Sequence, residues 1–443
     1  MSFDLPVLPD GWTYVPLEQL AQKNSVTYGV VQPGTHVEEG VPIVRVNNFK
    51  DGCIELADVM RIAPDIESKY GRTRLEGGEV LLTIVGSVGQ VAVVPRGLKG
   101  FNVARAVAVI HLTSAVESDW LALCLRSPLS QHLLTSRANT TVQTTINLKD
   151  LRALPVPIPP KAERRRIADL LSALNDRIYL LRETNATLEA IAQALFKSWF
   201  VDFDPVHARA RGEQPAGLAP EVAALFPDSF EESVLGRVPK GWRTGAFRDV
   251  CVRIESGGTP RRSVPEYWGG GVSWLSSGEV RSPIVFDTKE TITDLGVKES
   301  AAKLWPQGTT VVAMYGATAG EVCLLARPTT ANQACCGLIA KPQARAFMFM
   351  CARRERAALA SKSSGSAQQN LNKGIIENHP LVLPPIELLS TYEESAGALL
   401  DCWIANDHQA QILATLRDTL LPRLISGQLR LPDAEQQLKD LAV

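Results

Sequence analysis

Apolar residues recur in alternating steps of four and three along two long stretches of the chain. Residues 161–200 keep this spacing over more than four heptads and contain neither Gly nor Pro. Residues 386–421 repeat it at a constant offset of 225 positions, which is the separation of Ile167 and Tyr392. A seam of this period predicts a coiled coil, whereas a helix packed on its own domain would show a broader apolar stripe. The first seam consists of Ile167, Leu171, Leu174, Ile178, Leu181, Asn185, Leu188, Ala192, Leu195 and Trp199, and the second of Tyr392, Ala396, Leu399, Trp403, Asn406, Ala410, Leu413, Arg417, Leu420 and Leu424.

Two such seams in one chain most simply pack against each other, and antiparallel pairing gives the two halves a pseudo-two-fold relation. In that register the numbers of facing residues add up to 591, so that Asn185 faces Asn406. A buried asparagine in a seam costs stability but fixes the alignment, because any slip leaves its amide without a partner. We expect Pro422 to weaken the last turn of the second helix and Gly427 to end it. Arg417 is a charged residue at a heptad position that is usually apolar.

The segments outside the two helices have a different pattern. Short β-like runs such as VPIVRV at 41–46, VAVIHL at 107–112 and TTVVAMY at 309–315 are separated by Gly, Pro and Asn turns. This pattern is typical of strand-rich globular domains with a few helices. The sequence therefore predicts an α+β protein, with two strand-rich mixed globular domains joined by two long antiparallel coiled-coil helices.

The chain contains an internal repeat. LPDGW at 8–12 returns as VPKGW at 238–242, and QTTINLKDLRALPVPIPP at 143–160 returns as QQNLNKGIIENHPLVLPP at 368–385. Two copies of one plan explain these ordered matches better than chance. The predicted parts are a first globular domain (1–160), a first long helix (161–200), a linker with partner contacts (201–236), a second globular domain (237–385), a second long helix (386–426) and a C-terminal tail (427–443).

Composition and charge narrow the class of protein. The hydrophobic content of 45% and the charged content of 21% are those of a globular protein, and no apolar run reaches membrane-spanning length. We therefore expect a cytoplasmic protein without membrane contact. Eight cysteines without a C-x-x-C pair and six scattered histidines suggest neither a metal site nor a disulfide framework. The net charge of −1 means that any contact with DNA must depend on local basic patches.

Sequence signals of catalysis are missing. The chain has no G-x-x-x-x-G-K-[ST] phosphate loop, no Asn/Asp-Pro-Pro-aromatic element of an amino-methyltransferase, and no acidic pair with lysine in nuclease spacing. Asp204 and His207 lie in a polar linker and are expected to be surface residues. We expect no catalytic residue, no metal site and no cofactor in this chain.

The order of parts resembles one known family. The linker LFKSWFVDFDPVHARARGE…LFPDSFEESVLGRVPKGW at 195–242, the loop SGGTP…YWGGGVSW and the segment QQNLNKG are similar to the DNA-specificity (S) subunit of type I restriction–modification systems. The similarity covers essentially the whole chain. It implies that each globular domain is a target-recognition domain, which reads one half of a split site in double-stranded DNA.

The resemblance also implies partners. The long helices would set the spacing of the half-sites and bind two methyltransferase subunits, and restriction/translocase subunits would join for cleavage. S-adenosylmethionine would then belong to the partner methyltransferase, and ATP with Mg to the partner nuclease subunit. Two alternatives remain at this point: a recognition subunit of another phage-defence methyltransferase, and a coiled-coil adaptor that binds no DNA.

Candidate DNA-binding residues lie in polar, basic loops of both copies. Cations suit phosphates, and asparagine suits adenine because its amide both accepts and donates. In the loop SGGTPRRSVPEYWGGGVSWLSSG at 256–278, we expect Trp268 and Trp274 to brace the loop rather than contact bases. The first copy lacks this TPRR run and tryptophan pair, so the two domains should read different sequences, giving an asymmetric site. The candidates are Asn47, Asn48, Lys50, Arg72, Arg74, Gln143, Thr144 and Lys149 in the first copy, and Thr259, Arg261, Arg262, Ser276, Ser277, Gln368, Gln369, Asn370 and Lys373 in the second.

Overall fold

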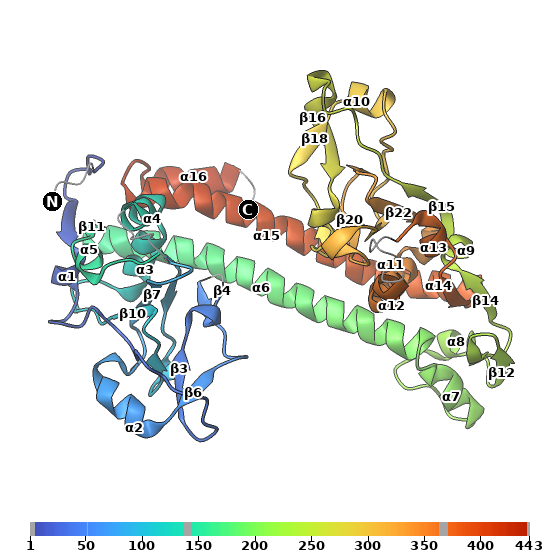
Figure 1. Ribbon diagram of the computed structural model, residues 1–443, viewed down its shortest axis with the longest axis horizontal. Coiled ribbons are helices and arrows are strands. Elements are labelled where there is room, and N and C mark those ends of the chain that lie inside the picture. The colour runs from blue at the N-terminus through green and yellow to red at the C-terminus, as the bar shows by residue number, and fades with distance from the viewer. Residues whose placement is uncertain (1–4, 51, 137–143, 363–370, 441–443) are drawn as a thin grey trace. The chain divides into compact units, whose positions relative to one another are not determined.

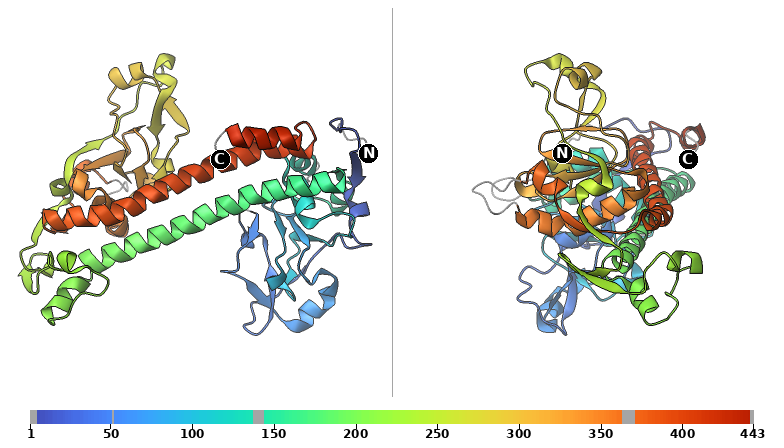
Figure 2. Two further views of the ribbon diagram at one scale, coloured as in Figure 1. Left: turned by 180° about the vertical axis from the view of Figure 1, so that it is seen from behind. Right: turned by 90° about the vertical axis from the view of Figure 1, so that its right-hand side faces the viewer.

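The computed structural model of the protein describes residues 5–50, 52–136, 144–362 and 371–440. Its contacts divide the chain into two compact units, Met1–Ile178 with Ile412–Val443, and Tyr179–Gln411. Each unit contains one globular domain and a stretch of each long helix, α6 (Lys161–Phe200) and α15 (Ala398–Ile425). Within each unit the two stretches lie side by side (Figure 1; Figure 2).

The first unit contains a four-stranded sheet in the order β2-β10-β7-β8, a three-stranded sheet in the order β6-β3-β9, and the pairs β1-β11 and β4-β5. A buried apolar cluster that includes Leu81, Val103 and Val109 lies among these strands. The elements are β1 (Thr13–Pro16), α1 (Leu17–Leu20), β2 (Thr27–Tyr28), β3 (Val41–Val44), β4 (Phe49–Lys50), β5 (Cys53–Ile54), β6 (Met60–Ile62), α2 (Pro64–Glu67), β7 (Val80–Thr83), β8 (Val91–Val93), β9 (Asn102–Val103), β10 (Val107–Ile110), α3 (Ser118–Arg126), α4 (Pro128–Thr135), α5 (Leu148–Arg152), β11 (Pro155–Ile158) and α16 (Leu431–Asp440).

The second unit contains a five-stranded sheet in the order β15-β22-β19-β20-β17, a three-stranded sheet in the order β18-β16-β21, and the pairs β14-β23 and β12-β13. The elements are α7 (Asp204–Ala210), α8 (Pro220–Ala223), β12 (Phe230–Ser233), β13 (Gly236–Pro239), β14 (Arg243–Ala246), α9 (Phe247–Val250), β15 (Cys251–Ser256), β16 (Trp268–Leu275), β17 (Ile284–Val285), β18 (Glu290–Ile292), α10 (Asp294–Lys298), β19 (Thr310–Ala313), β20 (Val322–Leu325), β21 (Thr330–Ala331), β22 (Cys335–Ala340), α11 (Arg345–Arg354), α12 (Arg356–Lys362), α13 (Lys373–Glu377), β23 (Pro380–Leu383) and α14 (Ile386–Tyr392).

The strand orders confirm the internal repeat. Strands β2, β10, β7 and β8 occupy the same sequence in their sheet as β15, β22, β19 and β20 do in theirs. In the smaller sheets, β3 pairs antiparallel with β6 and parallel with β9, as β16 does with β18 and β21. The matched asparagines of the repeat also have one role, because the side chains of Asn147 and Asn372 both cap a following short helix.

The antiparallel register derived from the heptads is confirmed within both units. Asn406 Nδ2 donates to Asn185 Oδ1 at 3.0 Å, and Asn185, 6% exposed, donates to the Trp403 carbonyl at 3.3 Å. In the first unit Arg417 donates to Asn175 Oδ1 at 3.0 Å. A side-chain amide on the neighbouring helix therefore accepts a hydrogen bond from this cation beside the seam.

The second long helix is interrupted, although the heptads predict a continuous one. A π-helical turn at Glu393–Gly397 separates α14 from α15. Arg345 of α11 reaches this turn, where it donates to Glu393 Oε1 at 3.0 Å and to the Gly397 carbonyl at 3.2 Å. A wider turn leaves carbonyls free for such a donor.

The second helix ends where expected. Pro422 lies in the last turn of α15, and Gly427, with φ of +72°, follows the end of this helix. The predicted tail contains helix α16 (Leu431–Asp440). An ion pair between Arg430 and Glu163, with nitrogen and oxygen 3.0 Å apart, connects the start of this helix to α6.

We predict that the two asparagines are unequal in stability. Asn406→Ala leaves the buried Asn185 oxygen without a donor and should lower the free energy of unfolding by about 1–3 kcal/mol. Asn185→Ala should cost less, because the half-buried Asn406 keeps access to water. Replacing both by leucine should restore or exceed the original stability in urea unfolding, with Thr187→Ala as an exposed control. Equal losses for both single variants would contradict this account.

Candidate nucleic-acid interface

Four loops of the first domain converge on one turn, Ala104–Ala106, between β9 and β10. Backbone hydrogen bonds connect this turn, or Val103 just before it, to the loops at Val30, Val44 and Ile84. The loop at Ile146 joins through a backbone hydrogen bond to Ile84. The bonds are Val30 N to Val103 O at 2.8 Å, Ala104 N to Val44 O at 2.9 Å, Ile84 N to Ala106 O at 2.8 Å and Ile146 N to Ile84 O at 2.9 Å. This convergence brings the predicted segments 28–52 and 143–149 to one edge of the domain.

Two adjoining hollows of about 590 and 510 Å³ lie beside this turn. Phe49 and Gln90 line both, Asn47 and Ser87 line the first, and Lys50 lines the second. The β7–β8 turn therefore contributes polar side chains that the sequence alone did not single out. Side chains of this kind can donate to phosphates or to base edges.

Several predicted residues of the first domain have structural roles. Asn48 is only 2% exposed, and its amide donates to the Glu55 and Asp58 carbonyls, both at 3.1 Å. Arg74 donates to both oxygens of the buried Glu67, at 2.9 and 2.6 Å. These hydrogen bonds hold the pKa of Glu67 below its usual range. Asn48 is therefore buried, and Arg74, although its side chain is 45% exposed, is held by Glu67.

The other predicted residues of the first domain are more accessible. Asn47 donates to Asp58 at 3.1 Å, and Lys50 pairs with Glu55 at 2.8 Å, in both cases at the surface. Arg72 and Lys149 are exposed and form no ion pair with the residues that the structure describes. The hydrogen bonds that gather the other loops do not involve the segment of Arg72. The carbonyl of Thr144 accepts from Gly86 at 3.1 Å, and Gln143 lies outside the described residues.

The second domain has the same convergence around the turn Asn332–Ala334, between β21 and β22. The corresponding bonds are Gly258 N to Ala331 O at 2.8 Å, Asn332 N to Leu275 O at 2.9 Å, Met314 N to Ala334 O at 2.7 Å and Leu371 N to Met314 O at 2.8 Å. Two of the candidates, Thr259 and Ser276, directly follow bonded residues, and Lys373 lies two positions after one. The segments expected to bind DNA therefore meet at equivalent places in both copies.

The loop SGGTPRRSVPEYW is braced from inside, as expected for its tryptophans. Trp268 and Trp274 pack edge to face with ring centroids 5.0 Å apart, and Trp274 Nε1 donates to the Gly258 carbonyl at 3.0 Å. A Cβ atom on Gly257 would lie 2.3 Å from the Asn332 carbonyl oxygen. The loop glycines therefore permit close backbone packing rather than flexibility.

The adjacent arginines of this loop have different surroundings. The Arg262 guanidinium lies 3.7 Å from the Trp268 ring centroid and pairs with both carboxylate oxygens of Glu290. The hydrogen bond to Glu290 raises the pKa of Arg262, and this carboxylate offsets the charge of the guanidinium at the surface. Arg261 is exposed and forms no ion pair within the described part of the chain. Of the two, Arg261 is the cation available to a phosphate.

The remaining candidates of the second domain also differ in whether a neighbouring side chain holds them. Ser276 donates to Glu279 at 2.6 Å in a capping arrangement, whereas no such bond holds the half-buried Ser277 hydroxyl among the described residues. Thr259 donates to Gln333 Oε1, and Lys373 pairs with Glu377 at 3.4 Å on the surface. Gln368, Gln369 and Asn370 lie outside the described residues.

Sequence reasoning missed the residues at the centres of the two turns, Arg105 and Gln333. Both side chains are exposed. Aligning the strings ARAVAV (104–109) and NQACCG (332–337) of the two copies could have revealed them, because an arginine in one copy stands where a glutamine stands in the other.

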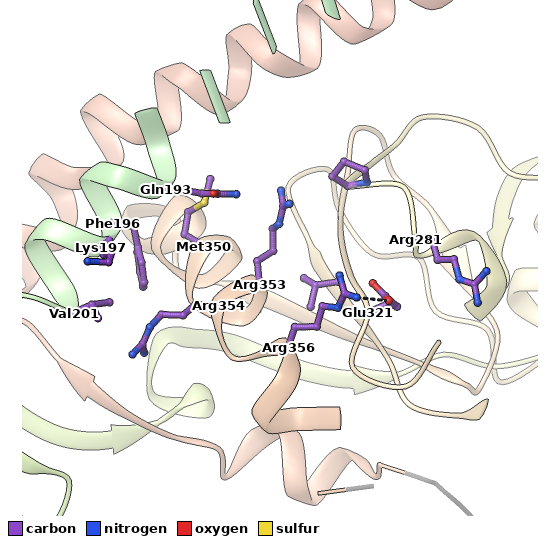
Figure 3. Close-up of a pocket in the computed structure, with 12 residues that line it drawn as sticks. Gln193, Phe196, Lys197, Val201, Arg281, Glu321, Met350, Arg353, Arg354 and Arg356 are labelled. Atoms are coloured by element: carbon purple, nitrogen blue, oxygen red, sulfur yellow. Dashed lines mark ion pairs between the residues drawn. The ribbon is translucent and has the colours of Figure 1, made fainter. Parts of the chain in front are cut away.

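A basic cavity of about 450 Å³ lies elsewhere in the second unit, between α6, α11 and the loops near Arg281 (Figure 3). Most of its cations are already paired, because Arg356 contacts Glu321 at 2.9 Å and Arg354 contacts Glu355 at 2.6 Å. Figure 3 shows the cationic side chains spread around the cavity without a common point. This cavity therefore fits a phosphate less well than the exposed loops do.

Within residues 5–50, 52–136, 144–362 and 371–440, no cluster of His, Cys, Asp or Glu has the arrangement of a metal site. No helix in this part of the chain could span a membrane. All eight cysteines are free thiols.

Comparisons with known proteins agree with the geometry. The model of a family described as the type I restriction modification DNA specificity domain matches residues 9–190 and 239–397. The chain is similar to the specificity subunit of the type I restriction enzyme HindI of Haemophilus influenzae, with 28% identity over 337 residues, or 66% of this chain and 72% of that protein. It is also similar to the EcoBI specificity subunit of Escherichia coli, with 31% identity over 199 residues, or 42% of each chain.

Among solved structures, the S subunit of a type I restriction–modification system from M. genitalium matches with a TM-score of 0.62. The match covers 95% of this chain and 98% of that chain at 14% identity. At this identity the likeness shows the fold alone. The match extends over both globular domains and both long helices.

We predict that the two adjacent arginines can be separated by experiment. Arg262→Ala removes the pair with Glu290 and the contact with Trp268, and should destabilise the loop by up to about 1 kcal/mol in urea unfolding. Arg261→Ala should leave unfolding unchanged, weaken duplex binding and reduce the salt slope by about 1. Identical effects of the two substitutions would refute this division of roles.

Glu67 should make the stability of the first unit depend on acid pH. Its folded pKa is depressed, so its contribution is present above the unfolded value of about 4.3 and is lost as the pH falls through the folded value. Glu67→Gln should lower the melting temperature at pH 7 and flatten its decline below about pH 4. Glu38→Gln, at an exposed glutamate of the same domain, is the control. A Glu67 variant with an unchanged acid profile would exclude this role.

Proposed function

The chain belongs to the family of type I restriction–modification DNA specificity subunits, and from this premise we propose that it reads an asymmetric bipartite DNA site and directs adenine methylation and restriction to it. Members of this family are non-catalytic recognition subunits. That assignment decides against a coiled-coil adaptor that binds no DNA. We propose further that each globular domain reads one half-site.

One observation carries the asymmetry of the site. The two domains have the same strand order and gather the same four loops around equivalent turns, yet the side chains on those loops differ. Asn47, Lys50 and Gln90 lie at this edge of the first domain, whereas Thr259 and Lys373 lie at that of the second. A common scaffold with different polar side chains suits two half-sites of different sequence.

The accessible candidates form the proposed DNA-contacting set. Cations would contact phosphates and position the duplex, while amides and hydroxyls would reach base edges. We retain Asn47, Lys50, Arg72, Thr144, Lys149, Thr259, Arg261, Ser277 and Lys373 in this set, and assign Asn48, Arg74, Arg262 and Ser276 to the support of the loops.

Partner subunits would supply the chemistry. We propose that two methyltransferase subunits bind along the long helices and that restriction/translocase subunits complete the complex in the cytoplasm. Exposed apolar side chains on α6, namely Tyr179, Leu180 and Ile191, support such docking, because burial of exposed apolar area stabilises association. S-adenosylmethionine would bind to the methyltransferase, and ATP with Mg²⁺ to the restriction subunit. Identification of copurifying subunits separates this system from a phage-defence methyltransferase without a restriction partner.

The test compares methylation with and without this chain. The purified chain alone should transfer no methyl group, and the cognate methyltransferase should lose its site selectivity when the chain is omitted. Mapping of methylated adenines across a genome measures both. Methyl transfer by the chain free of partner, or an unchanged methylation pattern in its absence, would overturn the proposal.

A further inference from the structure

Arg105 and Gln333 occupy the same position in the two copies of the fold. Each lies in the turn that joins the last strand of the smaller sheet, β9 or β21, to the second strand of the larger one, β10 or β22. The four backbone bonds that surround the two turns correspond one to one and agree in length within 0.1 Å. The equivalence therefore comes from matched geometry and not from sequence identity.

A glycine strengthens this correspondence. Gly29 precedes Val30, and a Cβ atom on it would lie 1.9 Å from the Val103 carbonyl oxygen. Gly257 precedes Gly258, and a Cβ atom on it would lie 2.4 Å from the carbonyl oxygen of Ala331. Both copies thus need a glycine where the first loop crosses the strand before the turn, so the scaffold holds each turn at a set place among its neighbours.

The side chains on these two turns are available for a ligand. Arg105 is exposed, and its guanidinium forms no hydrogen bond or ion pair with the residues that the structure describes. Gln333 is exposed, and its Oε1 accepts from Thr259, which leaves a second lone pair on that oxygen and both N–H groups of the amide. Thr259 therefore orients the amide without consuming its capacity to read a base.

The surrounding polar residues are less suited to the same task. Asn48 is buried in its own turn, Arg262 is held by Glu290, and Ser276 is held by Glu279. Arg105 and Gln333 instead project from the point where the four loops of each domain meet. At the centre of several loops that contact DNA, a side chain can reach into a groove while neighbouring residues bind the phosphates.

The two residue types have different preferences for bases. A guanidinium donates two hydrogen bonds to the O6 and N7 acceptors of guanine, whereas a glutamine amide accepts from N6 and donates to N7 of adenine. We infer that Arg105 reads a guanine in one half-site and that Gln333 reads an adenine in the other. This inference rests on the proposed function, and it names the bases at equivalent points of the two half-sites.

The test uses the full chain assembled with its cognate methyltransferase, followed by mapping of methylated sites on a genome. Arg105→Ala should lower methylation of the normal site about 5- to 150-fold and relax the guanine preference at one position of one half-site. Arg105→Gln should shift that position toward adenine. Gln333→Ala and Gln333→Arg should give the converse results in the other half-site, with the first half-site unchanged.

Arg96→Ala is the matched control, because Arg96 is an exposed arginine of the same domain that forms no ion pair with the described residues. Arg96 lies beside Gly77, a residue that precedes β7. The Ala104–Ala106 turn instead contacts Ile84, which follows the other end of this strand. This variant should keep both half-sites. Unfolding in urea should be unchanged for all five variants. Among the residues that the structure describes, the side chains of Arg105 and Arg96 form no hydrogen bond or ion pair, and that of Gln333 forms one, with Thr259 at the surface.

Two results would overturn the inference. If Arg105→Ala and Gln333→Ala keep the original site at the original rate, neither residue reads a base. If they weaken methylation equally at all sequences, they contact phosphates instead. If the unaltered chain directs methylation to no defined site, the proposed function fails as well, whereas a defined site that the variants leave unchanged removes the base-reading inference alone.

Discussion

The antiparallel pairing of α6 with α15 is the constraint on which both compact units depend. Each unit contains a stretch of both helices. The first unit combines Met1–Ile178 with Ile412–Val443, and in the second, Tyr179–Gln411, the pairing joins the two ends of one contiguous segment. The Asn185–Asn406 bond selects the register of this pairing in the second unit, because a shifted seam leaves a buried amide without a partner. In the first unit the same direction of pairing brings Arg430 to Glu163 and closes Gly427 onto Pro9.

The globular domains combine a constant scaffold with variable side chains. Backbone hydrogen bonds gather the loops, and these bonds make no demand on the identity of most side chains. The exceptions are positions such as Gly29 and Gly257, where only the absence of a Cβ atom permits the approach of a neighbouring strand. Residues on the exposed side of the same loops are free to differ, so one fold can present two different sets of polar side chains.

Internal pairing decides which polar residues remain available to DNA. Arg74 and Arg262 resemble their neighbours in the sequence, yet Arg74 is held by the carboxylate of Glu67 in α2 and Arg262 by that of Glu290 in β18. The buried Glu67 needs a cation, because an unpaired carboxylate away from water is costly. A basic loop is therefore not uniformly basic toward a ligand.

The sequence by itself determined the internal repeat, the two long helices and their register, because heptad spacing and apolar periodicity are local properties that the chain carries along its length. It also indicated the bracing role of Trp268 and Trp274, since paired aromatic rings within a turn-rich segment mark it.

Only the tertiary structure decided which of those loops meet and which side chains stay free. The π-helical turn at Glu393–Gly397 depends on Arg345 from another helix, and no helical pattern encodes that distant partner. Asn48 and Asn47 are neighbours in sequence, yet one amide is buried and the other is exposed. The equivalence of Arg105 and Gln333 is established by matched backbone hydrogen bonds, which join residues far apart in the chain.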